Sequence, residues 1–426
     1  MGANSTSAAV QDQPTPGLPL VSARYIWLLV LGQFGVFIAF MTPVAISLAI
    51  RVQDLAPDRD EYLGYITGSG AAAVMFTAPL VGILSDRTRT RMGRRRPYMI
   101  GGMAVGVLSL VVMALAPSVL VLGFGWLLAQ LGWGTVLGSL QISAADRLPE
   151  SQRGKVSGLA GLATQAAPVL GVMIAGGLAG NSVLLFLVPG IIGVLLVTLF
   201  VVFVPEEDTR GAVFPDRLTV GTVFARFLFN PLTQVDFALA WLGRFLFYVG
   251  LTLATTFTAF FFATRLDMTL TEVAGIVAAV GAASVLAVTI GALGAGLLSD
   301  RLKRRRLFVL IGALVFCGGV LLQAFSSTAP MLFAGSLLAS VGIGAYSAVD
   351  QALLLDVLPH RELEAGRFMG ITGFATSIPQ ALAPFIAPLI LGVGGGPEKN
   401  YTLLYTVAAA SVLVGGLVVL RIRSVR

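Results

Sequence analysis

Two opposite charges lie inside stretches of the sequence that are otherwise apolar. Arg244 falls within residues 237–262 and Asp350 within residues 331–356. In helices these side chains would lie at similar depths, roughly 10–13 Å from one end. An ionisable group at the centre of a membrane helix costs about 2.5–3.5 kcal/mol. We therefore predict that Arg244 and Asp350 pair in an empty cavity; the alternative is a purely structural ion pair, or an Arg244 that extends to the membrane surface.

Asp350 is also the best candidate for a group that exchanges a proton. Burial and a neighbouring Arg244 act in opposite directions on the pKa of such a carboxyl group, so movement that separates the pair could trigger protonation. Gln33 and Gln141 occupy corresponding depths in the first half, and Gln351 follows Asp350. Glutamine both donates and accepts hydrogen bonds, which suits a hydroxyl-rich solute, although it also links helices.

The composition indicates what kind of protein must position these groups. Of 426 residues, 56% are hydrophobic and 12% charged, against about 25% charged in a soluble domain. The net charge of +7 comes from basic residues in short gaps between apolar stretches, which argues against nucleic acid as a partner. Cys317 is the single cysteine, expected to be a packing residue, and His360 is expected in a solvated loop. No metal site is predicted.

Twelve stretches are long and apolar enough to cross a bilayer, which requires about 20 residues each. They fall into two sets of six, separated by the longest connection. The expected organisation is a disordered cytoplasmic tail (1–24), an N-terminal six-helix bundle (25–204), a cytoplasmic linker (205–236), a C-terminal six-helix bundle (237–420) and a cytoplasmic tail (421–426). Lys and Arg gather after the second and eighth stretches and at the C-terminus, so both termini are expected to be cytoplasmic.

An internal repeat relates the two halves. Gly82-Ile-Leu-Ser-Asp86-Arg87 recurs as Gly296-Leu-Leu-Ser-Asp300-Arg301, and Gln141, Asp146 and Pro149 recur as Gln351, Asp356 and Pro359. Because each half has six spans, the two repeats cross the membrane in the same sense. The fold class predicted is an all-α membrane protein with twelve transmembrane helices in two pseudo-symmetric, parallel six-helix bundles, with a solute site between them.

The repeated loop resembles a known family. Gly82-x-Leu-Ser-Asp-Arg followed by Gly93-Arg-Arg-Arg96 is similar to the hallmark loop of the major facilitator superfamily, and the longer form from Ser85 to Tyr98 resembles the loop of sucrose transporters. These lie near the glycoside–pentoside–hexuronide cation symporters. That resemblance implies the major facilitator fold, a cavity lined by spans one, four, seven and ten, and a sugar or glycoside as solute.

Charged residues at the basic end of both halves are predicted to form gates. Charge-assisted pairs between carboxylates and arginine are strong and geometrically specific. Pairs that break when the halves move apart would bias one conformation over another; the alternative is a solvated basic loop that only sets orientation. The predicted gating residues are Gly82, Asp86, Arg87, Arg94, Asp146, Glu150 and Arg153 in the first half, and Asp300, Arg301, Arg305, Asp356 and Arg367 in the second.

The sequence therefore predicts a secondary active transporter in the cell membrane, with a proton gradient as driving force and no cofactor. A proton-coupled sugar or glycoside symporter is favoured. A proton-linked exporter of drugs or metabolites stays open, because Ala167-Pro168-Val-Leu-Gly171 partly resembles an element of drug–proton antiporters. No Walker-type loop and no catalytic constellation is visible, so an enzyme is not expected. The expected partners are a small-molecule solute and the lipid bilayer, and the chain is expected to act as a monomer.

Overall fold

The computed structural model describes residues 19–57, 59–206, 208–211, 230–359, 361–394 and 399–425. Within these ranges the regular elements are helices. Twelve of these helical segments are long and apolar enough to cross a membrane, which confirms the twelve predicted spans. Most of the predicted linker, and His360, lie outside the described residues.

The first bundle consists of six spans. Its elements are α1 (Ala23–Thr42), η1 (Pro43–Ser47), α2 (Leu48–Leu55), α3 (Glu61–Asp86), α4 (Arg96–Ala114), α5 (Val119–Arg147), α6 (Glu150–Gly177) and α7 (Ser182–Phe203). The second bundle contains α9 (Val235–Thr256), α10 (Thr258–Leu266), α11 (Leu270–Leu302), α12 (Arg305–Ala324), α13 (Ala329–Asp356), α14 (Arg361–Leu391) and α15 (Tyr401–Val419).

Two spans depart from the uninterrupted helices that were predicted. The first widens into the π-helical turn η1, which begins at Pro43, and continues to Leu55 rather than to residue 50. Proline has no N–H to donate to the preceding turn, so the helical register changes where it occurs. The seventh span breaks at Phe257 between α9 and α10, where the Thr258 hydroxyl donates to the Ala254 carbonyl.

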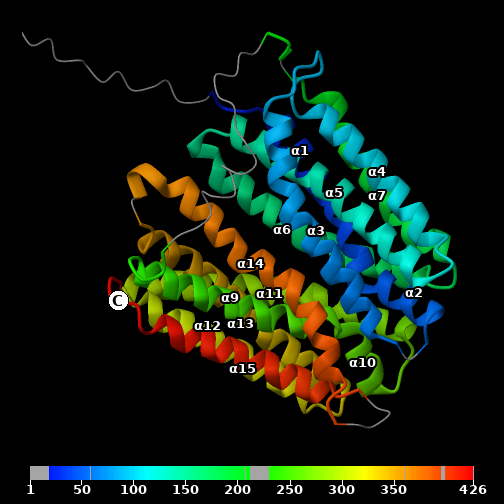
Figure 1. The fold of residues 1–426 in the computed structure, drawn as a ribbon, viewed down its shortest axis with the longest axis vertical. Helices are drawn as coiled ribbons and strands as arrows, with labels where there is room; N and C mark the ends of the chain where they lie inside the picture. Colours follow the sequence, from blue (N-terminus) through cyan, green and yellow to red (C-terminus); the bar gives the residue numbers. More distant parts are fainter. Residues whose placement is uncertain are drawn as a thin grey trace, which may run out of the picture.

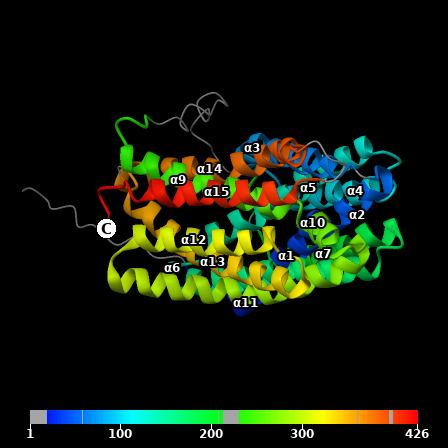
Figure 2. The ribbon, with the colours of Figure 1, turned by 90° about the horizontal axis from the view of Figure 1, so that it is seen from below.

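The same helix pairs pack in both bundles. In the first, α1 packs on α6 and α7, and α5 packs on α3 and α4. In the second, α9 packs on α14 and α15, and α13 packs on α11 and α12. Figures 1 and 2 show these two sets of helices as bundles with their helices running lengthwise side by side. The repeat found in the sequence is therefore a repeat of packing.

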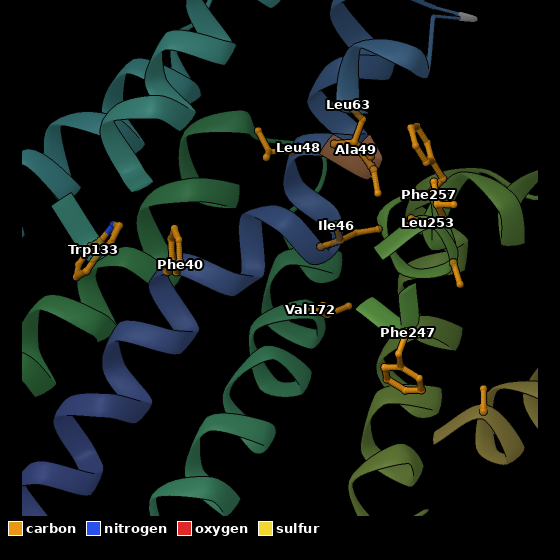
Figure 3. Packing of buried hydrophobic residues seen from close by; sticks show 14 of the residues in the cluster. Phe40, Ile46, Leu48, Ala49, Leu63, Trp133, Val172, Phe247, Leu253 and Phe257 are labelled. Atoms are coloured by element: carbon orange, nitrogen blue, oxygen red, sulfur yellow. The ribbon is translucent and has the colours of Figure 1, made fainter. Parts of the chain in front are cut away.

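The bundles contact each other mainly through α3 with α14 and α6 with α11, and to a smaller extent through α2 with α11 and α3 with α9. In Figure 1 the bundles meet at the ends that carry α2 and α10 and diverge toward the ends that carry the basic connections and the C-terminus. We call these the closed end and the basic end. Figure 3 shows apolar side chains of both bundles near the meeting point, with Ile46 and Val172 directed toward the α9 side of the view. The apolar core runs through both bundles and includes side chains where they meet.

Small residues set the spacing of the helices. A Cβ added at Gly132 in α5 would lie 2.5 Å from the backbone nitrogen of Gly106 and 2.8 Å from the carbonyl oxygen of Gly102, both in α4. Such contacts let two backbones approach closely, which is how helices associate in lipid.

We expect Gly132→Ala to destabilise the protein by about 1–3 kcal/mol, because the added methyl group must push α4 and α5 apart. Thermal unfolding in detergent would measure the change. Gly101→Ala in α4 is the matched control, since nothing lies within 4 Å of a Cβ there. Equal melting temperatures for the two variants would contradict this account of the packing.

Candidate functional site

The structure brings Arg244 of α9 and Asp350 of α13 together. Nη1 of Arg244 lies 3.5 Å from Oδ2 of Asp350, and the two side chains are 15% and 2% exposed. The same Nη1 donates to Oε1 of Gln351 at 3.4 Å, and the guanidinium lies 5.7 Å from the centre of the Tyr248 ring. Three residues predicted from the sequence therefore form one polar cluster within a bundle of apolar helices.

This cluster has unused hydrogen-bonding capacity. The buried Oδ1 of Asp350 and Nε of Arg244 have no hydrogen-bond partner among the described protein atoms, and the buried Tyr346 hydroxyl lies beside the Asp350 carboxylate. A buried polar atom without a partner costs about 1–3 kcal/mol, so such atoms usually meet water or a ligand. The arrangement can accept hydroxyl groups of a solute or hold a proton on the carboxylate.

Aromatic stacking holds α9 and α13 in register beside the pair. The rings of Phe247 and Tyr346 are stacked with centroids 3.5 Å apart, and Phe316 of α12 lies 5.4 Å from Phe247. Phe247 and Tyr346 are fully buried. They are therefore packing residues. Phe247 lies one helical turn from Arg244 and Tyr346 one turn from Asp350, so their stacking helps to set the distance between the guanidinium and the carboxylate.

The polar residues of the first bundle are not gathered in the same way. Gln33 in α1 is buried at 8% exposure, whereas Gln141 in α5 is exposed, and neither has a described hydrogen bond. A small cavity of about 60 Å³ between α3 and α5 is lined by Gln130, Thr77 and Thr135 among others. The rest of its lining is mostly apolar, and the hydroxyl groups of Thr77 and Thr135 donate to carbonyl groups of their own helices, so the sequence gives no signal for this cavity.

Ion pairs at the basic end join helices of the same bundle. Asp146 Oδ2 lies 2.8 Å from Nη2 of Arg94 and 3.4 Å from Nη2 of Arg95. In the second bundle, Arg305 lies 3.0 Å from Asp356 and 3.4 Å from Asp300. Asp146 and Asp356 are equivalent positions of the repeat. Each described pair at this end stays within one bundle, so these pairs do not close an entrance in this structure.

The surroundings of the remaining predicted gating residues are described only in part, so their gating role stays a prediction. Arg153 donates from Nε to the Leu148 carbonyl and has no described ion pair, and Arg301 is exposed without one. Arg367 lies 5.3 Å from the Phe368 ring centre, and Arg87 has further interactions of its own. The side chains of Asp86 and Glu150 lie outside what the structure describes.

The space between the bundles differs at the two ends. Nothing lies within 4 Å of a Cβ built at Gly82 in α3 or at Gly373 in α14, both toward the basic end. At the closed end of the same helix pair, a Cβ at Gly68 would lie 2.8 Å from the Phe385 ring, and one at Gly64 would collide with the Pro384 carbonyl. The helices α3 and α14 are therefore in close contact at the closed end and separated at the basic end.

A group of polar side chains spans the two bundles at the closed end. The ammonium of Lys399 lies 3.2 Å from Asp60 and 3.4 Å from Glu61, and the Tyr401 hydroxyl donates to Asp60 at 2.6 Å. Tyr401 is buried, and the charged side chains are half-buried; Lys399 is 23% and Asp60 17% exposed. We call Asp60, Glu61, Lys399 and Tyr401 the cross-bundle latch. The sequence does not predict this latch, because Asp60 and Glu61 are more than 330 residues away from Lys399 and Tyr401 in the chain.

Comparison with known proteins places this geometry in context. A family model described as "Major Facilitator Superfamily" matches residues 26–290 and again residues 240–426. The general alpha-glucoside permease of Schizosaccharomyces pombe (strain 972 / ATCC 24843) is 32% identical over 108 residues. That match covers 24% of this chain and only 18% of the permease.

Two solved structures are similar in fold over nearly the whole chain. The nucleoside transporter NupG superposes with a TM-score of 0.73 at 12% identity, covering 93% of this chain and 98% of that chain. A bacterial homologue of the human lysosomal transporter Spinster, solved in an inward-facing and unoccupied conformation, superposes with a TM-score of 0.70 at 17% identity, covering 95% and 99%. At these identities the likeness shows the fold alone.

Removal of one member of the Arg244–Asp350 pair should destabilise the protein more than removal of both. A single buried charge left behind costs about 3–5 kcal/mol, whereas replacing both partners is much less costly. We expect Asp350→Asn and Arg244→Gln each to lower the melting temperature in detergent, and the double variant to recover most of the loss. Additive losses in the double variant would show that the two groups act independently.

Loss of the shared cation in the cross-bundle latch should open the closed end. Lys399→Met removes the only cation shared by Asp60 and Glu61 among the described ion pairs, while Glu61 keeps its pair with Arg59. Partly exposed ion pairs contribute up to about 1 kcal/mol, or roughly fivefold in a conformational equilibrium. The reporter is Val172→Cys, which introduces a thiol at a buried position of the interface. We expect a membrane-impermeant maleimide to label it about fivefold faster in the Lys399→Met background.

Lys155→Met, an exposed lysine at the basic end, provides the matched control and should leave the labelling rate unchanged. The native thiol of Cys317 is buried and gives a low background. Unaltered labelling in Lys399→Met would mean that apolar packing alone keeps this end closed.

Proposed function

Because the chain belongs to the major facilitator superfamily, whose proteins are transporters rather than enzymes, we propose that it carries a sugar or glycoside together with protons by alternating access. It is a multi-pass membrane protein with twelve spans. The observation on which the proposal rests is the buried Arg244–Asp350 pair with its unpartnered oxygen and nitrogen atoms. Ionisable side chains inside membrane spans are costly to insert, and those that occur usually take part in substrate binding or ion coupling.

Asp350 is proposed as the proton carrier. In this structure its carboxylate is paired with Arg244 at 3.5 Å. A solute hydroxyl that hydrogen-bonds to Arg244 or Gln351 would compete for the guanidinium. The carboxylate would then lose its counter-charge in a buried setting, where the neutral form is favoured. Proton uptake and solute binding would thereby be coupled through one side chain.

Three observations support a sugar or glycoside as the solute. Gln351 and the guanidinium of Arg244 together offer both hydrogen-bond donors and acceptors, as polyhydroxylated molecules require. The aromatic face of Tyr248 lies beside Arg244. In addition, part of the chain is similar to a permease named for alpha-glucosides, although the match spans only 18% of that protein.

The basic end is proposed to face the cytoplasm of a cell membrane, with both termini on that side, because arginine and lysine are retained in cytoplasmic connections. In that orientation the structure corresponds to a state accessible from the cytoplasm, and the cross-bundle latch closes the outer side. Transport would then require the latch to open as the halves close at the basic end.

An exporter is the second candidate. Pro168 lies inside α6, and the Gly171 backbone packs against Thr42 of α1 one turn further on. The same stretch of α6 approaches α11 of the second bundle, since a Cβ at Gly281 would lie 3.1 Å from Val169. A proline-interrupted helix at a bundle interface is suited to gating in either direction.

Transport into proteoliposomes with an imposed pH gradient tests the proposal. We expect labelled mono- or disaccharide to accumulate only when the gradient drives protons in the same direction as the sugar. Asp350→Asn should abolish accumulation while still permitting exchange of labelled for unlabelled sugar across the membrane, because asparagine resembles the protonated carboxyl group but cannot release a proton. Since this variant is expected to be less stable, its melting temperature must first be shown to exceed the assay temperature. Asp208→Asn, an exposed carboxylate paired with Arg210 in the linker, is the matched control.

Two results would overturn the assignment. Accumulation by Asp350→Asn at the wild-type level would exclude Asp350 as the proton carrier. Solute movement opposite to the proton gradient, with labelled drugs or metabolites but not with sugars, would favour the exporter.

A further inference from the structure

A large cavity lies at the basic end of the second bundle, away from the Arg244–Asp350 pair. Its volume is about 1210 Å³, and it is formed by the turn between α11 and α12 and by the residues that follow α15. Lys303, Arg304, Arg305 and Arg306 line it in an unbroken basic run. Asp300 and Asp356 also line it, but both carboxylates are paired with Arg305, which leaves Lys303 and Arg304 exposed and without a described ion pair.

The two bundles are built alike at this point. In the first, the guanidinium of Arg96 at the start of α4 donates to the Val204 carbonyl, one residue past the end of α7. In the second, the guanidinium of Arg306 near the start of α12 donates to the Leu420 carbonyl, one residue past the end of α15, and to the Ile422 carbonyl. The start of α4 and the start of α12 are therefore equivalent positions.

In the first bundle this position holds an anion supplied by the chain itself. Oε2 of Glu206 accepts hydrogen bonds from the backbone N–H groups of Arg95 at 3.1 Å and Arg96 at 3.3 Å. Gly93, at φ +83°, lies so close that a side chain there would collide with the Glu206 carboxylate. A carboxylate at a helix start satisfies free N–H groups and complements the helix dipole.

In the second bundle the described residues after α15, 420–425, carry no carboxylate side chain. The position equivalent to Glu206 is Ile422, which is buried, and the N–H group of Ser424 donates to Asp236 of α9 at 2.8 Å. A basic cavity that Ser424 lines lies beside the start of α12, with no carboxylate from this segment in its lining.

We propose that this cavity binds the phosphate group of an anionic phospholipid. Leu302, Leu307 and Leu420 line the same cavity and are 57%, 39% and 40% exposed, so a phosphate at Lys303 and Arg304 would have apolar side chains beside it for the acyl chains. Basic pockets between transmembrane helices at the membrane surface are suited to such headgroups. The inference depends on the chain spanning a membrane and not on which solute it transports.

Native mass spectrometry of the purified protein with added phosphatidylglycerol or phosphatidylcholine tests the proposal. We expect phosphatidylglycerol to be retained in preference to phosphatidylcholine. The double variant Lys303→Gln/Arg304→Gln should lower that retention roughly tenfold or more, since each basic residue near an anionic surface strengthens binding roughly fivefold. Ser424→Glu, which supplies a carboxylate to the cavity, should also lower it. The melting temperature in phosphatidylcholine checks that all variants remain folded.

Arg91→Gln, an exposed arginine in the corresponding loop of the first bundle, is the control and should retain phosphatidylglycerol like the wild type. An equal loss in Arg91→Gln would overturn the proposal, because any basic residue at this end would then suffice. Displacement of the lipid by inorganic phosphate at a matched concentration would also overturn it, since the site would then recognise the phosphate group without the acyl chains.

Discussion

A charge inside an apolar helical bundle must find a partner, and that constraint governs the interior of this protein. Arg244 and Asp350 come from helices that are separated by about a hundred residues in the chain, yet they meet at 3.5 Å. The close stacking of Phe247 on Tyr346 fixes the two helices beside the pair. Because Oδ1 of Asp350 and Nε of Arg244 are buried without protein partners, the pair can form new hydrogen bonds with a solute or bind a proton. The stability of the bundle and its ability to bind a solute therefore depend on the same few atoms.

The two ends of the molecule use different kinds of interaction. At the closed end, packed aromatic rings and backbone carbonyls are reinforced by ionic contacts that join one bundle to the other. At the basic end, the described ionic contacts stay within each bundle and brace its own loop. A rigid-body movement of the bundles would break the first set and leave the second intact. The braced loops are thus suited to hold each bundle together during such a movement.

Much of the architecture could be predicted from the sequence, because span length, basic connections and the repeated loop are local signals. The proximity of Arg244 and Asp350 was also within reach, since isolated charges in long apolar stretches are few enough to match by depth. The break at Phe257 was not, because threonine and phenylalanine are ordinary residues in a membrane helix. Nor was the contact of Asp60 with Tyr401, which depends on the conformation that the bundles adopt. Two of the predicted gating pairs, Arg94–Asp146 and Arg305–Asp356, are formed, and their role as gates stays a prediction.

The equivalent packing of the two bundles has an evolutionary consequence. The two halves share only short motifs in sequence. Glycines nevertheless lie at the contact of α4 with α5 and at that of α12 with α13, with Gly132 near Gly106 and Gly342 near Phe316. After an ancestral duplication, drift could therefore replace most side chains as long as the distance between paired backbones was preserved. The common origin of the two halves is therefore easier to recognise from their helix contacts than from their sequence identity.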